Sequence, residues 1–365
     1  MKPVYFAGRA LASALGPDLS HALDALRAGG VPPRPMAVSS DTAWPVFALV
    51  DAELESATRW RAHAQALITQ TARQSGALAD RHGPLFIASS SLDIGAIEIA
   101  ADADADMELS GDMQTFADRI AGWLDWRGPV FTVSTACTSS FNAVLSAAQL
   151  IAQGQAASAL VLGIELPNRL TVAGFGAMQL LSADAARPCG AARNGLVLGQ
   201  AVAALHLSSS PSRWRLAGGS NVVDGRDPAG AVPEAVVAMC RQALAASGLQ
   251  ASDIGLAKPQ AAGSVAGDRI ELEAMASVFG TMPPLVSFKS AVGHTLGAAG
   301  AAELALLLAC LEARCWPSTS YLLDPALPLS ALNTTPASSP RHVLASIIGF
   351  GGGHAAVVIQ DTLTP

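Results

Sequence analysis

The sequence has few charged and few aromatic residues. Of its 365 residues, 14% are charged, 5% are aromatic and 51% are hydrophobic, whereas about 25% charged residues is typical of globular domains. Disordered chains combine low hydrophobicity with high charge, so this composition excludes a disordered chain. The net charge of −7 argues against a nucleic-acid-binding protein, which needs a basic surface. Because few charges leave little surface to keep solvated, we expect a sizeable subunit interface.

The sequence also lacks a Cys-x-x-Cys pair and a long uncharged apolar run. Its five cysteines show no metal-ligand or redox-dithiol spacing, which favours reduced thiols in a reducing compartment. A membrane-spanning helix needs about 18 apolar residues, but the apolar stretch 304–311 is bounded by Glu303 and Glu312. Pro3 and Arg9 interrupt the first apolar stretch, so no secretory leader is expected. These absences predict a cytoplasmic protein.

Short apolar runs alternate with helical patterns rich in alanine and leucine. Strands are expected at residues 4–8, 86–88, 130–133, 160–163, 198–207, 214–217 and 285–288, and helices at 138–153, 233–247 and 298–312. A hairpin through Gly351–Gly353 is expected to join strands at 344–350 and 355–359. Such alternation predicts βαβ units and a parallel sheet that is buried on both faces.

A serine-rich break at Ser208–Ser212 divides the chain. At roughly 150 residues per domain, the length gives a prior of two or three domains. The same order of strands and helices restarts after the break, which indicates an internal duplication. We therefore predict an N-terminal half, residues 1–210, and a C-terminal half, residues 211–365.

Cys137 lies where a β-branched strand gives way to a helix, in the segment Thr132-Val-Ser-Thr-Ala-Cys137-Thr-Ser-Ser-Phe141. A thiol at a helix N-terminus is close to unpaired N–H groups and to the positive end of the helix dipole, and both stabilise the thiolate. A free cysteine is more often a small buried apolar residue. Here, however, the neighbouring serine, threonine and alanine residues leave room for a substrate. We therefore expect Cys137 to be a nucleophile.

Two glycine-containing segments carry further candidate residues. In residues 287–303 a strand is expected to end at Lys289, a tight loop carries His294, and an alanine-rich helix contains Glu303. Histidine titrates near neutral pH and can hydrogen-bond a thioester carbonyl, and Lys289 and Glu303 are expected to form a buried ion pair that positions the loop. The segment Gly349-Phe350-Gly-Gly-Gly-His354 either brings backbone close to a ligand or is an ordinary hairpin.

These three segments, in this order, resemble a β-ketoacyl-acyl-carrier-protein synthase, a condensing enzyme of the thiolase superfamily. The resemblance extends to residues Val4–Gly16, Ile151–Gly154, Gly163–Glu165, Phe175, Ser182, Arg187-Pro188, Arg193–Gly195 and Leu198–Gln200. It implies an α/β fold with five αβαβα layers from two duplicated halves, in an obligate homodimer or a heterodimer with another ketosynthase subunit. It also implies that no metal or diffusible redox cofactor is used, and that acyl groups arrive on the phosphopantetheine arm of an acyl carrier protein.

The resemblance implies a role for each candidate residue. Cys137 matches the acylated nucleophile, and its backbone N–H, with that of Phe350, would form the oxyanion hole. His294 matches a histidine of the oxyanion site for malonyl decarboxylation, and Lys289 and Glu303 match its supporting pair. Phe350 also matches the gating aromatic residue beside the cysteine.

The chain departs from the family pattern in the loop before Asp268. Counting back from this aspartate places Gln260 where the family usually has a second catalytic histidine. Glutamine can donate an N–H to a developing enolate oxygen, but it cannot act as a base. Of two hydroxyls that contact the pantetheine arm, one is replaced by Ala262 and the other remains as Ser264.

A second departure lies in the last glycine-rich segment. His354 stands where the family usually has asparagine. One hypothesis is that its imidazole partly replaces the one missing at Gln260, because both loops line the same pocket in the family. The alternative is that His354 only packs beside the site.

Three functions fit these residues. The first is a condensing enzyme that extends an acyl group on Cys137 with a decarboxylated malonyl unit, in fatty acid or polyketide/aryl-polyene-type biosynthesis. The second is an acyltransferase that loads Cys137 without decarboxylative extension. Losing one transition-state donor costs about 3–4 kcal/mol, and Gln260 in place of histidine would affect decarboxylation selectively. The third is a partner subunit like a chain-length factor, although a purely structural subunit need not keep Cys137 and His294.

Overall fold

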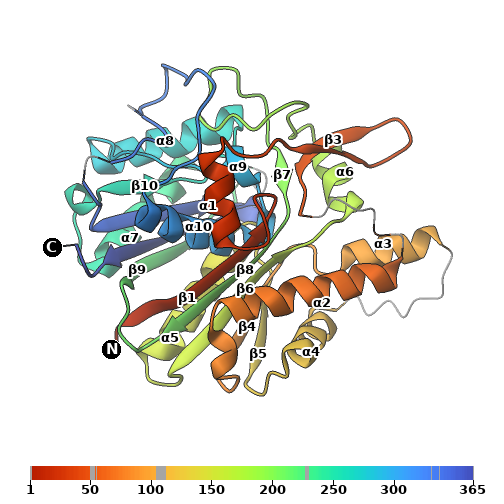
Figure 1. Ribbon diagram of the computed structural model, residues 1–365. Coiled ribbons are helices and arrows are strands. Elements are labelled where there is room, and N and C mark those ends of the chain that lie inside the picture. The colour runs from red at the N-terminus through yellow and green to blue at the C-terminus, as the bar shows by residue number, and fades with distance from the viewer. Residues whose placement is uncertain are drawn as a thin grey trace.

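A nine-stranded mixed sheet forms the centre of the molecule in the computed structural model, which describes residues 2–49, 54, 56–103, 112–226, 230–329, 331–336 and 338–364 (Figure 1). Its strand order is β10-β11-β12-β9-β1-β8-β6-β4-β5. The bounds are β1 Val4–Ser13, β4 Leu85–Ala88, β5 Val130–Val133, β6 Ser158–Glu165, β8 Ala201–Ser208, β9 Trp214–Val223, β10 Leu256–Lys258, β11 His342–Ile348 and β12 Gly353–Asp361. A three-stranded sheet contains β2 (Arg34–Ala37), β3 (Ala43–Phe47) and β7 (Leu198–Gly199).

Some of the helices begin or end at recognisable capping residues. Their bounds are α1 Leu19–Arg27, α2 Ala57–Gln74, α3 Ile94–Asp102, α4 Met113–Leu124, α5 Ser139–Ala152, α6 Arg169–Ala177, α7 Pro233–Ser247, α8 Val265–Phe279, α9 Lys289–Val292 and α10 Ala299–Ala313. Pro233 starts α7, and Gly248 ends it with φ +70°. Proline at the first position and glycine just past the end are the favoured residues there. Single 3-10 turns lie at Ala77–Ala79, Ala251–Asp253, Leu296–Ala298 and Phe350–Gly352.

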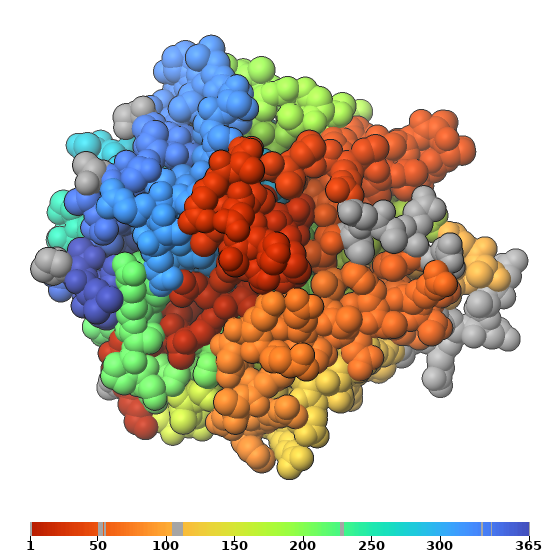
Figure 2. All heavy atoms as spheres, viewed as in Figure 1, coloured from red at the N-terminus to blue at the C-terminus, as the bar shows by residue number. Residues whose placement is uncertain are grey.

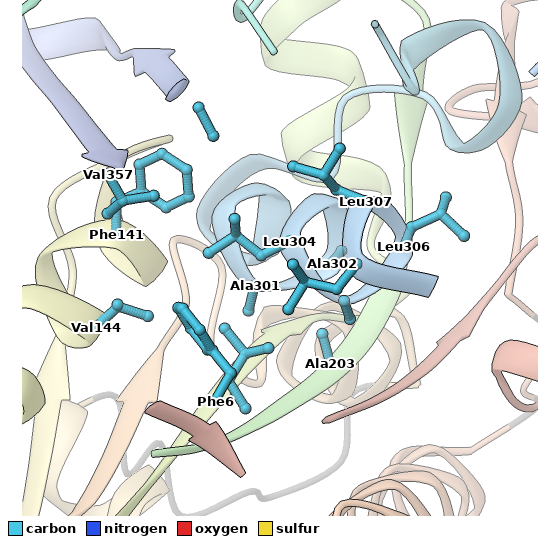
Figure 3. Close-up of a cluster of buried hydrophobic side chains, with 14 of the residues drawn as sticks. Phe6, Phe141, Val144, Ala203, Ala301, Ala302, Leu304, Leu306, Leu307 and Val357 are labelled. Carbon is cyan, nitrogen blue, oxygen red and sulfur yellow. The ribbon is translucent and has the colours of Figure 1, made fainter. Parts of the chain in front are cut away.

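The elements form five alternating layers. Helices α2 and α4 cover one face of the half-sheet that contains β4, β6 and β8. Helices α5 and α10 form a buried central layer, whose side chains pack against this half-sheet and against β11 and β12 (Figure 3). Helices α7 and α8 cover the outer face of β11 and β12. The αβαβα architecture implied by the resemblance is therefore present.

Helix α10 is apolar on all sides because it lies in this central layer. The segment Leu296–Ala313 is the one helical stretch among the described residues that is long and apolar enough to cross a membrane, and 89% of it is buried inside the protein. A helix that is hydrophobic all round is buried in a core or in a bilayer. Here α5, β6, β8 and α1 contact it (Figure 2 shows α1 beside the C-terminal third of the chain).

Most of the expected elements are present, with three corrections. The sheet is mixed rather than parallel, because β1, β8, β9 and β12 run antiparallel to their neighbours. The expected strand 198–207 divides at Gln200 into β7 and β8, which belong to different sheets. The expected strand 285–288 forms only isolated bridges at Leu285, and Lys289 begins a short helix instead of ending a strand. The serine-rich break at Ser208–Ser212, where the two halves were expected to meet, lies between β8 and β9. The division into two halves stays a prediction.

Candidate active site

Cys137 lies in a strained turn between β5 and α5. Ala136 has a φ of +52°, a conformation that is uncommon for residues with a Cβ and that clusters at functional sites. Hydroxyl groups hold the turn: Thr138 Oγ1 donates to the Thr135 carbonyl at 2.7 Å, and Ser139 Oγ donates to the Ala136 carbonyl at 2.6 Å. The serine and threonine residues noted in the sequence therefore bind backbone, and they aim the thiol at the carboxyl end of the sheet.

The structure brings Cys137, His294 and Gln260 together from three separate segments. His294 Nε2 lies 3.0 Å from Cys137 Sγ, and Gln260 Nε2 lies 3.3 Å from the same ring nitrogen. Strand β7 fixes the histidine backbone, since His294 N–H donates to the Val197 carbonyl at 2.8 Å and Gly199 N–H donates to the His294 carbonyl at 3.0 Å. A side chain at Gly199 would meet the Val292 carbonyl oxygen, so this close approach requires glycine.

The resting nucleophile is a thiol beside a neutral imidazole. Burial raises the pKa of Cys137 to about 11, although the backbone N–H of Phe350 and the charge of Lys289 oppose this effect. Burial, followed by the charges of Lys289 and Lys258, holds the pKa of His294 well below its usual value. The expectation of a helix-stabilised thiolate is thus not met in the resting site, because burial outweighs the N–H groups. A neutral imidazole at 3.0 Å can instead accept the thiol proton.

Two lysines share one buried glutamate beneath this pair. Lys289 Nζ contacts Glu303 Oε1, as expected, and Lys258 Nζ contacts Glu303 Oε2. All three side chains are at most 1% exposed. Lys258 also lies 5.9 Å from the centre of the Phe141 ring, at the start of the nucleophile helix. The ion pairs therefore join β10, α9 and α10 behind the Cys137 site.

Two carboxylates of α8 hold the loop that carries Gln260. Glu271 accepts the backbone N–H groups of Gln260 at 2.7 Å and Ala261 at 2.9 Å. Asp268 accepts the N–H groups of Ala262 and Gly263, each at 3.0 Å. Asp268 therefore supports the loop and does not contact Cys137. Ser264 caps α8, with its Oγ accepting the Gly267 N–H at 3.2 Å.

Phe350 and His354 come from the same hairpin but face different surroundings. The Phe350 ring stacks on Phe175 with centroids 5.5 Å apart, and its backbone N–H points toward the Cys137 sulfur. His354 shares a face of β12 with Ala356 and Val358, which pack in the outer cluster with α7 and α8, whereas Ala355 packs in the cluster of Cys137. Alternate strand residues face opposite sides of a sheet. This placement does not support a role for His354 as a replacement imidazole.

Three buried charged residues near the site were not among the sequence candidates. Lys258 and Glu271 are described above, and Glu165 binds the hydroxyls of Ser90 and Ser91 and the N–H of Gly297 at 3.2 Å. The i, i+3 spacing of Asp268 and Glu271 places both on one face of α8, which could have suggested a paired role. Nothing in the sequence around Lys258 indicates burial. Among the described residues no three His, Cys, Asp or Glu side chains are grouped to hold a metal ion.

Two family models match this chain. The model described as "Beta-ketoacyl synthase, N-terminal domain" matches residues 57–211, and "Beta-ketoacyl synthase, C-terminal domain" matches residues 219–322. Together they cover well over half of the sequence. The chain belongs to the β-ketoacyl synthase family.

Similar proteins include synthases of polyketide and fatty acid pathways. "Putative polyketide beta-ketoacyl synthase 1" of Streptomyces halstedii is 32% identical, over 67% of this chain and 64% of its own length. "3-oxoacyl-[acyl-carrier-protein] synthase 2" of Mycobacterium leprae is 31% identical, over 62% of this chain and 60% of its own length. The chain thus spans less than two thirds of the length of these relatives.

Solved structures share the fold at low sequence identity. One chain of the structure "Ketosynthase (ApeO) in Complex with its Chain Length Factor (ApeC) from Xenorhabdus doucetiae" gives a TM-score of 0.87 at 23% identity, with 99% of this chain and 98% of that chain covered. A β-ketoacyl synthase from Burkholderia phymatum gives 0.84 at 23% identity, with 99% and 100% covered. These matches establish a thiolase-like fold for the chain.

Proposed function

We propose that this β-ketoacyl synthase is a condensing enzyme that extends an acyl group on Cys137 with a malonyl unit. The observation that carries the proposal is the 3.0 Å contact between Cys137 Sγ and His294 Nε2, beside the Phe350 N–H and at the start of α5. A nucleophile, a neutral base and backbone donors are the parts that acyl transfer requires. The acyl and malonyl groups would arrive on the phosphopantetheine arm of an acyl carrier protein, with the Ser264 hydroxyl at that arm.

The first step would transfer the acyl group to Cys137. The thiol gives its proton to His294 Nε2 as the sulfur attacks the thioester carbonyl, and a tetrahedral oxyanion forms. The N–H groups of Cys137 and Phe350 donate to this oxyanion. When the oxyanion collapses, the carbon–sulfur bond to pantetheine breaks, and the pantetheine sulfur takes the proton from His294. The stacked rings of Phe350 and Phe175 would open to admit the arm.

The second step would form the new carbon–carbon bond. Loss of carbon dioxide from the malonyl thioester leaves its electron pair as an enolate, and Gln260 Nε2 beside His294 can donate to the enolate oxygen. The enolate carbon attacks the acyl carbonyl on Cys137, the bond to sulfur breaks, and Cys137 leaves as a thiolate that takes a proton from solvent water. Among the described residues, Gln260 Oε1 and His294 Nδ1 have no hydrogen-bond partner. Because buried polar atoms usually have one, the site retains capacity for a substrate.

Gln260 favours a second candidate, acyl transfer without extension. Its amide is neutral and donates one N–H toward the site. Compared with a histidine, it stabilises the enolate formed by decarboxylation less well, whereas acylation of Cys137 does not form this enolate. A partner subunit that pairs with an active ketosynthase is the third candidate. In each case we propose a dimer with a second ketosynthase-type chain in the cytoplasm.

Intact-mass spectrometry separates the three candidates. The purified protein is mixed with acyl carrier protein carrying an acyl group and then with malonyl carrier protein, with Cys137→Ala as the control. An adduct that requires Cys137 and is discharged as a ketoacyl product is expected for a condensing enzyme. An adduct that persists without release of carbon dioxide would establish acyl transfer alone. Absence of any adduct would favour the partner subunit.

Gln260→His tests the role of the glutamine. An imidazole at this position adds a donor that can carry charge, so the variant is expected to release carbon dioxide from malonyl carrier protein about tenfold faster. Acyl loading of Cys137 should stay within about twofold, because the oxyanion hole is untouched. An unchanged rate of carbon dioxide release would show that Gln260 does not limit decarboxylation.

A further inference from the structure

The chain contains three lysines, Lys2, Lys258 and Lys289, and two of them are buried against one glutamate. Lys258 is the last residue of β10 and is 0% exposed. Its Nζ contacts one oxygen of Glu303, while Lys289 contacts the other. Burying an ammonium group costs several kcal/mol of solvation that a balanced pair recovers only in part. Lys289 already neutralises Glu303. Lys258 is therefore a second buried cation that adds one positive charge to a balanced pair.

The charges around Lys258 can be counted element by element. Helix α10 contributes Glu303, α9 contributes Lys289 and α8 contributes Glu271, while the neutral His294 lies on the loop before α10. Burial raises the pKa of Glu271 to about 7. Together, Lys258, Lys289, Glu303 and Glu271 carry a net charge of +1 when Glu271 is protonated. Their net charge is zero when Glu271 is ionised. Without Lys258 the same group would carry zero or one negative charge.

The added charge lies beside Lys289, whose own charge acts on both Cys137 and His294. Lys258 is two residues before Gln260, its Nζ faces the Phe141 ring of the nucleophile helix, and its charge helps to keep His294 neutral. In a buried site a unit charge acts over several ångströms with little screening. The species that form there during acyl transfer and decarboxylation are anions: a thiolate, a tetrahedral oxyanion and an enolate. A fixed positive charge stabilises each of them.

We propose that Lys258 is a positioning residue of the Cys137 site, which acts through Glu303 and Lys289 to make the site one charge more positive toward anionic states, beside an uncharged Gln260. This inference rests on the proposed use of Cys137 as the nucleophile. It does not depend on whether the acyl group is later extended, so it can hold even if the proposed condensation does not occur.

The test compares two alkylating reagents of similar size at Cys137. Iodoacetate is an anion and iodoacetamide is neutral, so the ratio of their rates reports the local potential at the sulfur. Lys258→Met keeps the length of the side chain and removes the charge. The iodoacetate-to-iodoacetamide ratio is expected to fall about tenfold in this variant at pH 7. Lys2→Met is the matched control, because it removes the same charge from an exposed position and should leave the ratio unchanged.

If Lys258 contributes only to the stability of the fold, a different result is expected. The variant would then melt at a lower temperature while the rate ratio at Cys137 stayed as in the wild type, and this outcome would overturn the proposal. An unchanged ratio in a variant of wild-type melting temperature would overturn it as well.

Lysine NMR of the unaltered protein keeps the proposal testable if Lys258→Met does not fold. Labelling the lysine ε-carbons gives three signals, and Lys2→Met assigns the exposed one. Burial lowers the pKa of Lys258, and its amine is nevertheless expected to be charged at pH 7. Carboxymethylation of Cys137 should shift the signal of Lys258, because it adds a negative charge nearby. A buried signal that is already neutral at pH 7 would exclude a charge-setting role.

Discussion

At the scale of single residues, the site is defined by how deeply its ionisable groups are buried. Cys137 is 5% exposed and His294 is 2% exposed. Burial disfavours the charged form of each, so a thiol faces an uncharged ring. The pair is reactive only when a proton moves between them or a substrate supplies a partner. This arrangement differs from an exposed thiolate, which reacts with any electrophile in solution.

The raised pKa of Cys137 predicts the pH dependence of its alkylation. Because the pKa is about 11, the rate with iodoacetamide should rise about tenfold per pH unit from pH 7 to pH 10. Peptide mass spectrometry after timed quenching measures the rate at Cys137 apart from the other four cysteines, all of which are free. A rate that is constant from pH 7 upward would show a thiolate at rest and contradict this account.

At the scale of secondary-structure elements, glycine sets the approach of α10 to the nucleophile helix. A Cβ on Gly300 would lie 2.4 Å from Phe141 Cδ1 and 3.0 Å from Ser140 Cβ. Both neighbours are fully buried in α5, so neither can move aside easily. Glycine at position 300 is therefore required by the close packing of α10 on α5.

Gly300→Ala is expected to lower the free energy of unfolding by about 1–3 kcal/mol, because overpacking outweighs the better helix propensity of alanine. Gly122 in α4 provides the matched control, since a Cβ there would meet nothing within 4 Å. Gly122→Ala should raise the free energy of unfolding by up to about 1 kcal/mol. Urea titrations of the three proteins measure both changes. Equal effects of the two substitutions would contradict the close-packing argument.

Two buried carboxyl groups of α8, those of Asp268 and Glu271, predict how stability depends on pH. Burial raises the pKa of Glu271 to about 7 and that of Asp268 to about 6. The folded protein therefore holds protons that the unfolded chain releases between about pH 4 and pH 7, and stability falls as pH rises through this window. For Glu271 alone the loss is about 3 kcal/mol.

Denaturant titrations between pH 5 and pH 8 test this expectation. Glu271→Gln removes one of the two titrating groups, so it should flatten the decline even where the variant is less stable at every pH. A stability that rises steadily from pH 5 to pH 8, in both proteins, would show that these two carboxyl groups are not the controlling ones.

At the scale of the whole molecule, the nine-stranded sheet ends at β5. Among the described residues this strand pairs only with β4, and its Phe131 is 42% exposed, although the ring stacks on Phe86 with centroids 5.0 Å apart. Met113 nearby is 48% exposed. An exposed apolar edge strand is a template for pairing with another chain. Because β5 leads directly to Cys137, a partner on this edge would lie next to the nucleophile turn.

Phe131→Glu is expected to shift a dimer toward monomer, because it places a charge on this edge. Light scattering on a size-exclusion column measures the change. Leu363→Glu is the control, since Leu363 is a 73% exposed apolar residue near the C-terminus and far along the sequence from β5. A dimer that is unaffected by Phe131→Glu would place the subunit interface elsewhere.

The sequence alone determined the elements and the reactive groups that are close in sequence. Strand β5, the Cys137 turn, helices α5, α7 and α10, and the last hairpin follow from local alternation, glycine and proline positions. The Lys289–Glu303 pair and the family also follow from motifs. Each element and each motif is carried by residues within about 20 positions of each other, which is the range over which a pattern can be read, and the family follows from the order of three such motifs.

The tertiary structure decided what depends on packing between distant segments. It placed His294 and Gln260 at Cys137, divided residues 198–207 between two sheets, and turned His354 toward the outer helices. It also buried Lys258 on Glu303 and raised the pKa of Cys137 where the helix start alone predicted a thiolate. Burial and distance depend on which elements pack against one another, and local sequence patterns carry no direct record of either.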